Sequence, residues 1–382
     1  MRSRLYCLLW LLLASALKAA AQTPQPALPA PRFEHSVEPG PRHWRGTIGQ
    51  QAVTMELDSG FSGYYGHYYY DRRGRPLSLS QEPAKQKGKA RLDESFFDES
   101  GLSVVSGYFL FDSPLRTRLT GTWHSPDGRR TLPVALHETY ADALAYGTET
   151  WEVKNFGRDD SYDSTRLDSA ELRQNYLSFR PPLAAATRPL RAALGPPAAP
   201  PRLNHYLDSL LRTRHTGQSD YFFHSDAYVV YNSNQLFSVV QFEHFSAAED
   251  DDSGMYTHEW SQRRTYDLRT GRRLRLADLL LPGYEQPLRR WLRQCLKSVW
   301  ENQYYGEVGA NGKLPAGGFS VTGTGLAFSY DDRDDDSLGF PGPYHADRSV
   351  EVEISYETLL PIIRLNGPLA ALLRERHLLP IK

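Results

Sequence analysis

Cysteine is almost absent from this sequence, which has two cysteines in 382 residues. Cys7 lies in an N-terminal segment that we expect to be removed, so Cys295 would be alone in the mature chain. An internal disulfide is thereby excluded, and the packing of the core must hold the protein together. Cys295 occupies an apolar position of a predicted helix over 288–300, which favours a small buried side chain over a nucleophile.

A net charge is lacking too, because 44 basic side chains stand against 45 acidic ones. No field of the whole protein favours nucleic acid or an anionic membrane, so we predict no nucleic-acid partner. The twelve histidines form no H-E-x-x-H motif and no metal-ligand spacing. The sequence also contains no G-x-S-x-G, no phosphate loop and no dinucleotide fingerprint. We accordingly predict no cofactor, no metal and no enzymatic activity.

Long apolar runs are missing except for Leu5–Leu17, thirteen residues that follow Arg2 and Arg4 and precede the small residues 19–21. This pattern is typical of a secretory signal peptide over residues 1–21, and the run is shorter than the ~20 residues of a membrane span. The protein is therefore predicted to be secreted or periplasmic, and not membrane-spanning after signal removal. Residues 22–43, rich in Pro and Ala, are predicted to form a disordered tether.

What the sequence does have is tyrosine, 23 residues, and many short alternating segments joined by turn residues. Residues 44–140 contain several such segments, for example "AVTMEL" and the pair of strands around Pro126–Gly128. Short strands joined by tight turns predict a small antiparallel β-domain, closed as a barrel or packed as a sandwich. Residues 141–169 show no clear pattern and are treated as a connector.

Residues 170–382 mix strand patterns with amphipathic helices, which predicts an α+β domain: an antiparallel sheet with helices on one face. Its helices are expected over 203–214, 288–300 and near 357–364, followed by a last one after Pro368. A segment rich in Pro and Ala, 183–202, is predicted to be an extended insertion without a packed element.

The stretch "YDLRTGRRLRLADLL" illustrates how this domain is built. Tyr266 and Leu268 are expected to point inward before a turn at Gly271, where a positive φ is needed. Leu274 then resumes the inward pattern, and Asp278 is placed to cap the backbone N–H groups of the next turn. Every residue of the stretch has a structural role, and none is left over for chemistry.

These residues, together with "VEVEISYETLLPII" and "LNHYLDSL", resemble an extracytoplasmic domain of unknown function. It is shared by the lysozyme-sensing anti-sigma factor RsiV and the non-catalytic half of a peptidoglycan deacetylase. The resemblance covers about 170–382 and is interrupted by the segment 183–202. It implies an α+β domain that binds protein or cell-wall material, and it implies no catalytic residues. The N-terminal part resembles a β-meander module of secreted bacterial proteins.

The strongest binding feature is "GYYGHYYYD", in which Tyr64, Tyr68 and Tyr70 share one face of a strand and His67 lies on the other. One face must join the core, and the other would then be an exposed aromatic stripe suited to sugars or peptides. These four residues are the candidate ligand-binding residues. The predicted function is recognition of an extracellular protein or a cell-wall glycan.

The alternative function is an aspartic-type hydrolase that uses Asp58 and Asp252, each followed by Ser-Gly. Such an enzyme needs two facing turns whose carboxylates share a proton. However, Asp252 follows an acidic run typical of a solvated loop, and Asp-Ser-Gly is also a common turn. A second acidic run, Asp331–Asp336, lacks the pattern of a helix-loop-helix calcium site and is interpreted as a solvated loop.

Overall fold

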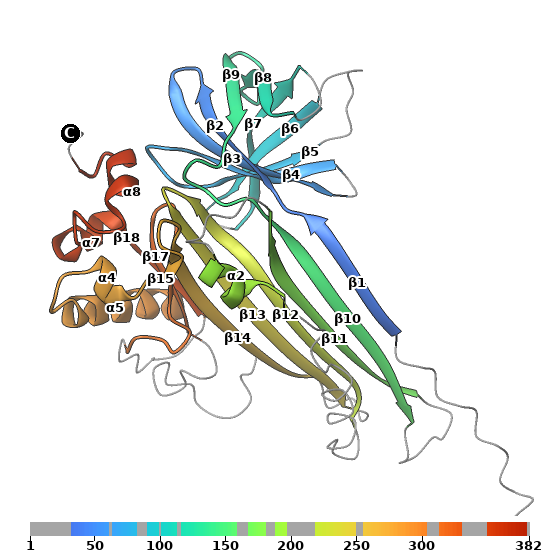
Figure 1. Cartoon of the computed structure of the whole chain (residues 1–382). Helices are drawn as coiled ribbons and strands as arrows, with labels where there is room; N and C mark the ends of the chain where they lie inside the picture. The colour runs from blue at the N-terminus through green and yellow to red at the C-terminus, as the bar shows by residue number, and fades with distance from the viewer. Residues whose placement is uncertain are drawn as a thin grey trace, which may run out of the picture.

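The computed structural model shows a mostly β protein in three parts: a closed barrel, a seven-stranded sheet and a three-stranded sheet with short helices (Figure 1). The predicted fold class, a small β-domain followed by a sheet with helices, is confirmed. The structure describes residues 32–60, 63–81, 90–98, 101–112, 116–158, 167–180, 188–196, 218–249, 255–303, 313–330 and 350–379.

The barrel contains eight antiparallel strands, each paired with the next in sequence, and β9 closes it on β2. It runs within residues 42–138. The strands are β2 (Arg42–Ile48), β3 (Gln51–Gly60), β4 (Gly63–Tyr70), β5 (Leu77–Gln81), β6 (Ala90–Phe97), β7 (Ser103–Phe111), β8 (Arg118–His124) and β9 (Thr131–Glu138).

Apolar side chains fill the barrel, as the alternation of β3 predicts: Val53, Met55 and Leu57 point inward and are almost fully buried. One carboxylate, Glu94, lies among them with 3% of its surface exposed. Three neighbouring side chains donate hydrogen bonds to it, which satisfies the buried charge. The donors are the Tyr68 hydroxyl (2.6 Å), the Trp123 indole N–H (2.7 Å) and the Ser106 hydroxyl (2.5 Å).

The seven-stranded sheet has the order β1-β10-β11-β12-β13-β14-β15. Its strands are antiparallel except for β11 and β12, which run parallel, so the expectation of a purely antiparallel sheet is wrong at this pair. The connection between them is long enough for a crossover. The strands are β1 (Arg32–Pro39), β10 (Tyr146–Arg158), β11 (Leu167–Phe179), β12 (Gln218–Ser233), β13 (Leu236–Glu249), β14 (Met255–Asp267) and β15 (Arg272–Arg273).

Two strands of this sheet and one helix lie in segments that were expected to have no such element. β1 lies in the segment expected to be a tether, and β10 lies within the expected connector, because the two strands pair with each other. Helix α2 (Arg188–Leu194) lies in the Pro/Ala-rich segment, and its Leu190 and Leu194 are buried against the sheet. A proline is tolerated in the first turn of a helix, and the next one follows only after α2 has ended.

The C-terminal part contains the three-stranded sheet β16 (Phe319–Val321), β17 (Gly325–Tyr330) and β18 (Val350–Ser355). Helix α5 (Glu285–Gln303) buries Leu288, Leu292 and Leu296 completely, at the predicted helical spacing. The short helices are α4 (Leu276–Leu279), α7 (Tyr356–Leu359), η3 (Leu360–Ile362) and α8 (Ala370–Glu375). The helix expected over 203–214 lies outside the described residues.

The turn between β14 and β15 forms as predicted. Gly271 has a φ of +67°, and Tyr266, Leu268 and Leu274 are buried on either side of it. Asp278 accepts a hydrogen bond from the backbone N–H of Arg275 at 2.7 Å. Its side chain thus caps the start of α4 (Leu276–Leu279), three residues before it, and not the turn after it as predicted.

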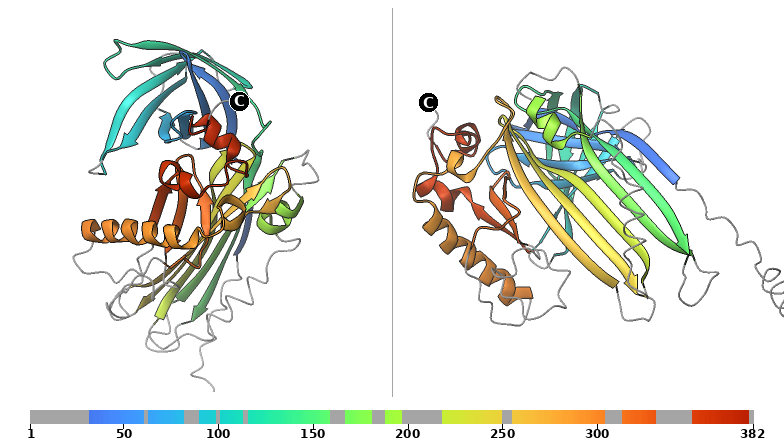
Figure 2. Two further views of the ribbon diagram at one scale, coloured as in Figure 1. Left: turned by 90° about the vertical axis from the view of Figure 1, so that its left-hand side faces the viewer. Right: turned by 60° about the horizontal axis from the view of Figure 1, so that its bottom comes forward.

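Two views in Figure 2 show the barrel at one end of the long sheet, with the three-stranded sheet and its helices alongside. The three parts share buried side chains. Tyr69 of the barrel and Tyr231 of β12 both belong to the apolar cluster of the C-terminal part. The region where the parts meet therefore contains a continuous core, and polar residues at its margin are held between two packed surfaces.

Candidate functional site

The outer face of the barrel carries a row of polar side chains where it meets the rest of the protein. Because inward and outward residues alternate, Thr54 and Glu56 of β3 point outward between the buried residues of that strand. Glu56 is paired across the strands with His43 on one side and His67 on the other. The strand register thus places one carboxylate between two imidazoles.

Glu56 is held by a hydrogen-bond network that joins the barrel to the sheet. His43 Nδ1 donates to Glu56 Oε1 at 3.0 Å, and Asn232 Nδ2 donates to the same oxygen at 3.1 Å. Asn232 also exchanges two hydrogen bonds with the backbone of Leu144, at 2.7 and 3.0 Å. His43 is 1% exposed and Glu56 7%, so the network is almost dry.

The pKa of Glu56 lies below its usual value of 4.5. Burial pushes the pKa upward, but the hydrogen bond from His43, the two neighbouring imidazoles and Asn232 outweigh burial. Glu56 is therefore a carboxylate at any pH near neutrality.

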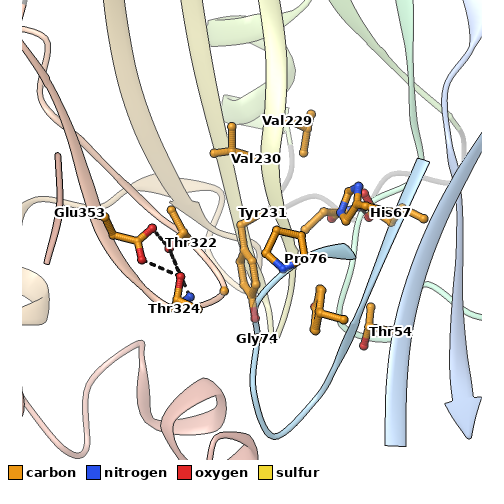
Figure 3. A pocket seen from close by; sticks show the side chains of 14 residues that line it. Thr54, His67, Gly74, Pro76, Val229, Val230, Tyr231, Thr322, Thr324 and Glu353 are labelled. Carbon is orange, nitrogen blue, oxygen red and sulfur yellow. Dashed lines mark hydrogen bonds between the residues drawn. The ribbon is translucent and has the colours of Figure 1, made fainter. Parts of the chain in front are cut away.

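A pocket of about 370 Å³ opens beside Glu56, between the barrel, β12 and the turn that joins β16 to β17. Its volume is in the range of small-molecule and side-chain binding sites. Figure 3 shows its walls, with Tyr231 and Pro76 between His67 on one side and Glu353 on the other. The lining residues are Thr54, Glu56, His67, Tyr69, Gly74, Pro76, Val229, Val230, Tyr231, Asn232, Thr322, Gly323, Thr324 and Glu353.

The wall opposite the barrel presents a second carboxylate. Glu353 of β18 is exposed, and it accepts hydrogen bonds from the hydroxyls of Thr322 (2.8 Å) and Thr324 (2.6 Å). The dashed lines in Figure 3 mark these contacts. The two threonines lie in the β16–β17 turn and hold Glu353 at the edge of the pocket.

A cluster of charges centred on Arg45 ties the barrel to the other parts next to this pocket. The Arg45 guanidinium contacts Asp142 at 2.8 Å, Asp71 at 3.4 Å and also Glu375 of α8. Burial raises the pKa of Asp71 above its usual value, as does the nearby Glu375, while Arg45 opposes both effects. Arg45 is thus the cation that allows three carboxylates to share a small volume.

Arg376 forms the second connection between the barrel and the C-terminal part. Its Nε donates to the carbonyl oxygen of Gly323 at 2.8 Å, and its Nη1 donates to the carbonyl oxygen of Asp71. The guanidinium lies over the ring of Tyr69, 5.1 Å from its centroid. Gly74 has a φ of +71° and abuts the Gly323 carbonyl, so the two backbones touch where the pocket ends.

The structure places the four predicted ligand-binding residues of β4 on two different faces of the barrel wall. Tyr68 is fully buried in the barrel, and Tyr64 and Tyr70 pack partly against the same core. The face that carries them is therefore the inner one, because the hydroxyl of Tyr68 has its partner in Glu94 inside the barrel. An exposed stripe at Tyr64, Tyr68 and Tyr70 is wrong, whereas His67 lines the pocket and keeps its candidate role.

Asp58, the described half of the alternative dyad, lies on the outer face of β3. Its Oδ1 accepts a hydrogen bond from the backbone N–H of Ser59 at 2.7 Å, and burial raises the pKa of its carboxyl. Asp252 lies outside the described residues, as does the acidic run Asp331–Asp336. The dyad stays a hypothesis.

The site residues that the sequence does not reveal are Glu56, Asn232 and Glu353. Glu56 and Asn232 are 176 residues apart, and no spacing connects them. The one local signal is the phase of "AVTMEL", which places Glu56 on the outer face. Its buried partner Asn232 becomes apparent only once the barrel is packed against β12.

A second hollow, of about 640 Å³, lies between Arg273–Ala277, Leu314 and Phe319. Its walls combine apolar side chains with Arg273 and Arg275, and no carboxylate lines it. Across the part of the chain that the structure describes, no three His, Cys, Asp or Glu side chains gather as a metal site. Within the same part, no helix is both long and apolar enough to cross a membrane.

Comparisons with known proteins add structural neighbours. No protein-family model matches the chain, and no curated protein does. Two solved structures of DUF3298 family proteins are similar to it. One, from Bacteroides fragilis, is 16% identical with a TM-score of 0.41, and the match covers 60% of this chain and 97% of that one. The other, from Pseudomonas aeruginosa, is 17% identical with a TM-score of 0.35, over 59% and 97%. Resemblance to the RsiV type stays a prediction.

Proposed function

We propose that this protein is a non-enzymatic recognition protein that works outside the cytoplasm, and that the pocket beside Glu56 receives a group of a protein or cell-envelope glycan. The observation that carries the proposal is the pocket itself. Side chains from the barrel, the long sheet and the C-terminal part converge on it, with carboxylates, hydroxyls and two phenol rings around a cavity of about 370 Å³.

The chemistry of the pocket favours binding over proton transfer. A general acid or base works best when its pKa lies near the working pH. The pKa of Glu56 is displaced in the opposite direction, below 4.5, and two hydrogen bonds fix its Oε1. A carboxylate held in this way is suited to attracting a ligand, and it is a poor proton carrier.

The proposed location is supported by the N-terminal pattern of Arg2, Arg4 and the apolar run Leu5–Leu17, typical of a signal peptide. The near absence of cysteine is compatible with an oxidising compartment, because Cys295 has no second thiol in the mature chain with which to mispair. Fractionation of the producing cells, with N-terminal sequencing of the mature protein, tests this part of the proposal.

Titration of the mature protein by two-dimensional NMR tests the recognition function. The ligands are muropeptides, chitooligosaccharides and short peptides, each followed at the resonances of His67, Tyr231 and Thr324. We expect at least one ligand class to shift these resonances while the ligand itself stays intact by mass spectrometry. If the wild type hydrolyses a ligand and the Asp58→Asn variant does not, the hydrolase alternative would replace the proposal.

A further inference from the structure

We propose that the pocket beside Glu56 takes an organic cation, the side chain of a lysine or arginine presented by a protein partner. This inference rests on the proposed function and assigns the ligand of the same pocket. The lining residues include two carboxylates, Glu56 and Glu353, and neither lysine nor arginine. Arg376, which contacts the lining residues Tyr69 and Gly323, is itself paired with Glu375. The two carboxylates of the lining are therefore expected to attract a positive charge.

The deep end of the pocket offers the carboxylate of Glu56 as an acceptor. The hydrogen bonds from His43 and Asn232 to Glu56 both end on Oε1. Glu56 is 7% exposed and lines the cavity. An ammonium or guanidinium in the cavity would therefore add a charge-assisted hydrogen bond to this carboxylate.

His43 uses one of its two ring nitrogens in this network. Nδ1 donates to Glu56 Oε1, and the Nε2 atom is buried and has no partner among the described residues. His43 therefore orients one oxygen of Glu56 by a single hydrogen bond.

An aromatic ring lies between Glu353 and His67 in the lining of the pocket. Figure 3 shows Tyr231 in the middle of the lining side chains, with Glu353 and the two threonines on one side and His67 on the other. Phenol rings attract cations. The same region already contains such a contact, since Arg376 of the protein lies over the ring of Tyr69, which also lines the pocket.

The apolar part of the lining favours a cation that is carried on an apolar hydrocarbon chain. Val230 is 38% exposed, far more than Glu56, so it lies closer to solvent, and Val229 and Pro76 line the same cavity. Lysine and arginine combine an apolar stem with a charged end, and they bury the stem against apolar side chains. The pocket thus matches a side chain that passes apolar residues and ends at a carboxylate.

Peptides that differ only in charge test the inference on the full mature chain. We choose acetyl-Gly-Lys-Gly-amide with its Nε-acetyllysine counterpart, and acetyl-Gly-Arg-Gly-amide with its citrulline counterpart. Affinity is measured by NMR titration at His67 and Tyr231. The cationic peptides are expected to bind at least about tenfold more tightly than their neutral counterparts, the factor that a charge-assisted hydrogen bond provides. Equal binding within each pair would overturn the inference.

Three variants locate the cation. Glu56→Gln keeps an acceptor for His43 and Asn232 but removes the charge, and Glu353→Gln does the same at an exposed position that tolerates substitution. Each is expected to weaken the cationic peptides about tenfold and leave the neutral ones unchanged. Glu357→Gln, at an exposed glutamate of α7 outside the pocket, is the control and should bind as the wild type does. An equal loss in all three variants would overturn the assignment.

The ligand panel separates this inference from the proposed function. A chitooligosaccharide that shifts His67 and Tyr231, where no cationic peptide does, would overturn the cation and keep the pocket as a recognition site. A panel in which no ligand shifts those resonances would overturn both. Loss of peptide binding when Asp334, Asp335 and Asp336 are replaced by Asn, with Glu56→Gln unaffected, would place the cation on the acidic run and overturn the inference.

Discussion

Replacing Gly74 with alanine is expected to loosen the contact between the barrel and the C-terminal part. A Cβ on Gly74 would lie 2.0 Å from the carbonyl oxygen of Gly323 and 2.3 Å from Arg376 Nε. Ordinary contact distances require the Gly323 turn to retreat by more than ~1 Å. That movement breaks the hydrogen bond from Arg376 to Gly323.

The size of the effect follows from two contributions. A left-handed φ of +71° costs an alanine roughly 1–2 kcal/mol. A hydrogen bond to a charged group contributes about 1.5–3 kcal/mol, and the displacement breaks the one that Arg376 donates to the Gly323 carbonyl. We expect Gly74→Ala to lower the free energy of unfolding by about 3–5 kcal/mol.

Gly128→Ala is a matched control. Gly128 has a φ of +70°, almost the same as that of Gly74, but its added Cβ would meet nothing closer than the Tyr108 hydroxyl at 3.9 Å. It should cost only the backbone contribution, roughly 1–2 kcal/mol. Urea unfolding followed by tryptophan fluorescence and circular dichroism measures both variants. An equal loss of stability in Gly74→Ala and Gly128→Ala would show that the Gly74–Gly323 contact does not hold the barrel to the C-terminal part.

Two further predictions concern the buried carboxylates. Glu94→Ala should be about 3–5 kcal/mol less stable than Glu94→Gln in urea unfolding, because only Gln still accepts hydrogen bonds from Tyr68 and Trp123 inside the barrel; similar stabilities would contradict this. The pKa of Glu56 is lower folded than unfolded, so its stabilisation is complete above about pH 4.5 and is lost as pH falls through the depressed pKa. The stability advantage of wild type over Glu56→Gln should therefore shrink between about pH 6 and about pH 3, and a constant difference would argue against the hydrogen bond from His43.

Local features of the fold could be predicted from the sequence because neighbouring residues determine them. The turn at Gly271 needs a positive φ, and the spacing of Leu288, Leu292 and Leu296 determines the buried face of α5. The strands of the barrel alternate, and tight turns join most of them, so the β-domain was predictable as barrel or sandwich. Closure of β9 on β2 depends on residues about 90 apart, and the pattern within each strand does not reveal it.

The candidate site was predictable only in part. His67 was identified from its strand, but the choice between the two faces of β4 depends on which face meets the barrel interior. Glu94 decides that choice, because its carboxylate requires the Tyr68 hydroxyl on the inside. Glu56 and Asn232 come together through docking of the barrel on β12, and no local pattern records that docking.

Strands β1 and β10 are neighbours in the long sheet, although the whole barrel lies between them in the chain. Pro39 is paired with Gly147, and a Cβ on Gly40 would lie 2.6 Å from the carbonyl oxygen of Tyr146, so the chain leaves the sheet and returns at almost one point. The barrel is thus an insertion between two neighbouring strands of the sheet. A tight loop that joins β1 to β10 could replace the barrel without changing the strand order of the sheet. Neither half would retain the cavity, since Glu56 would leave with one and Glu353 would stay with the other.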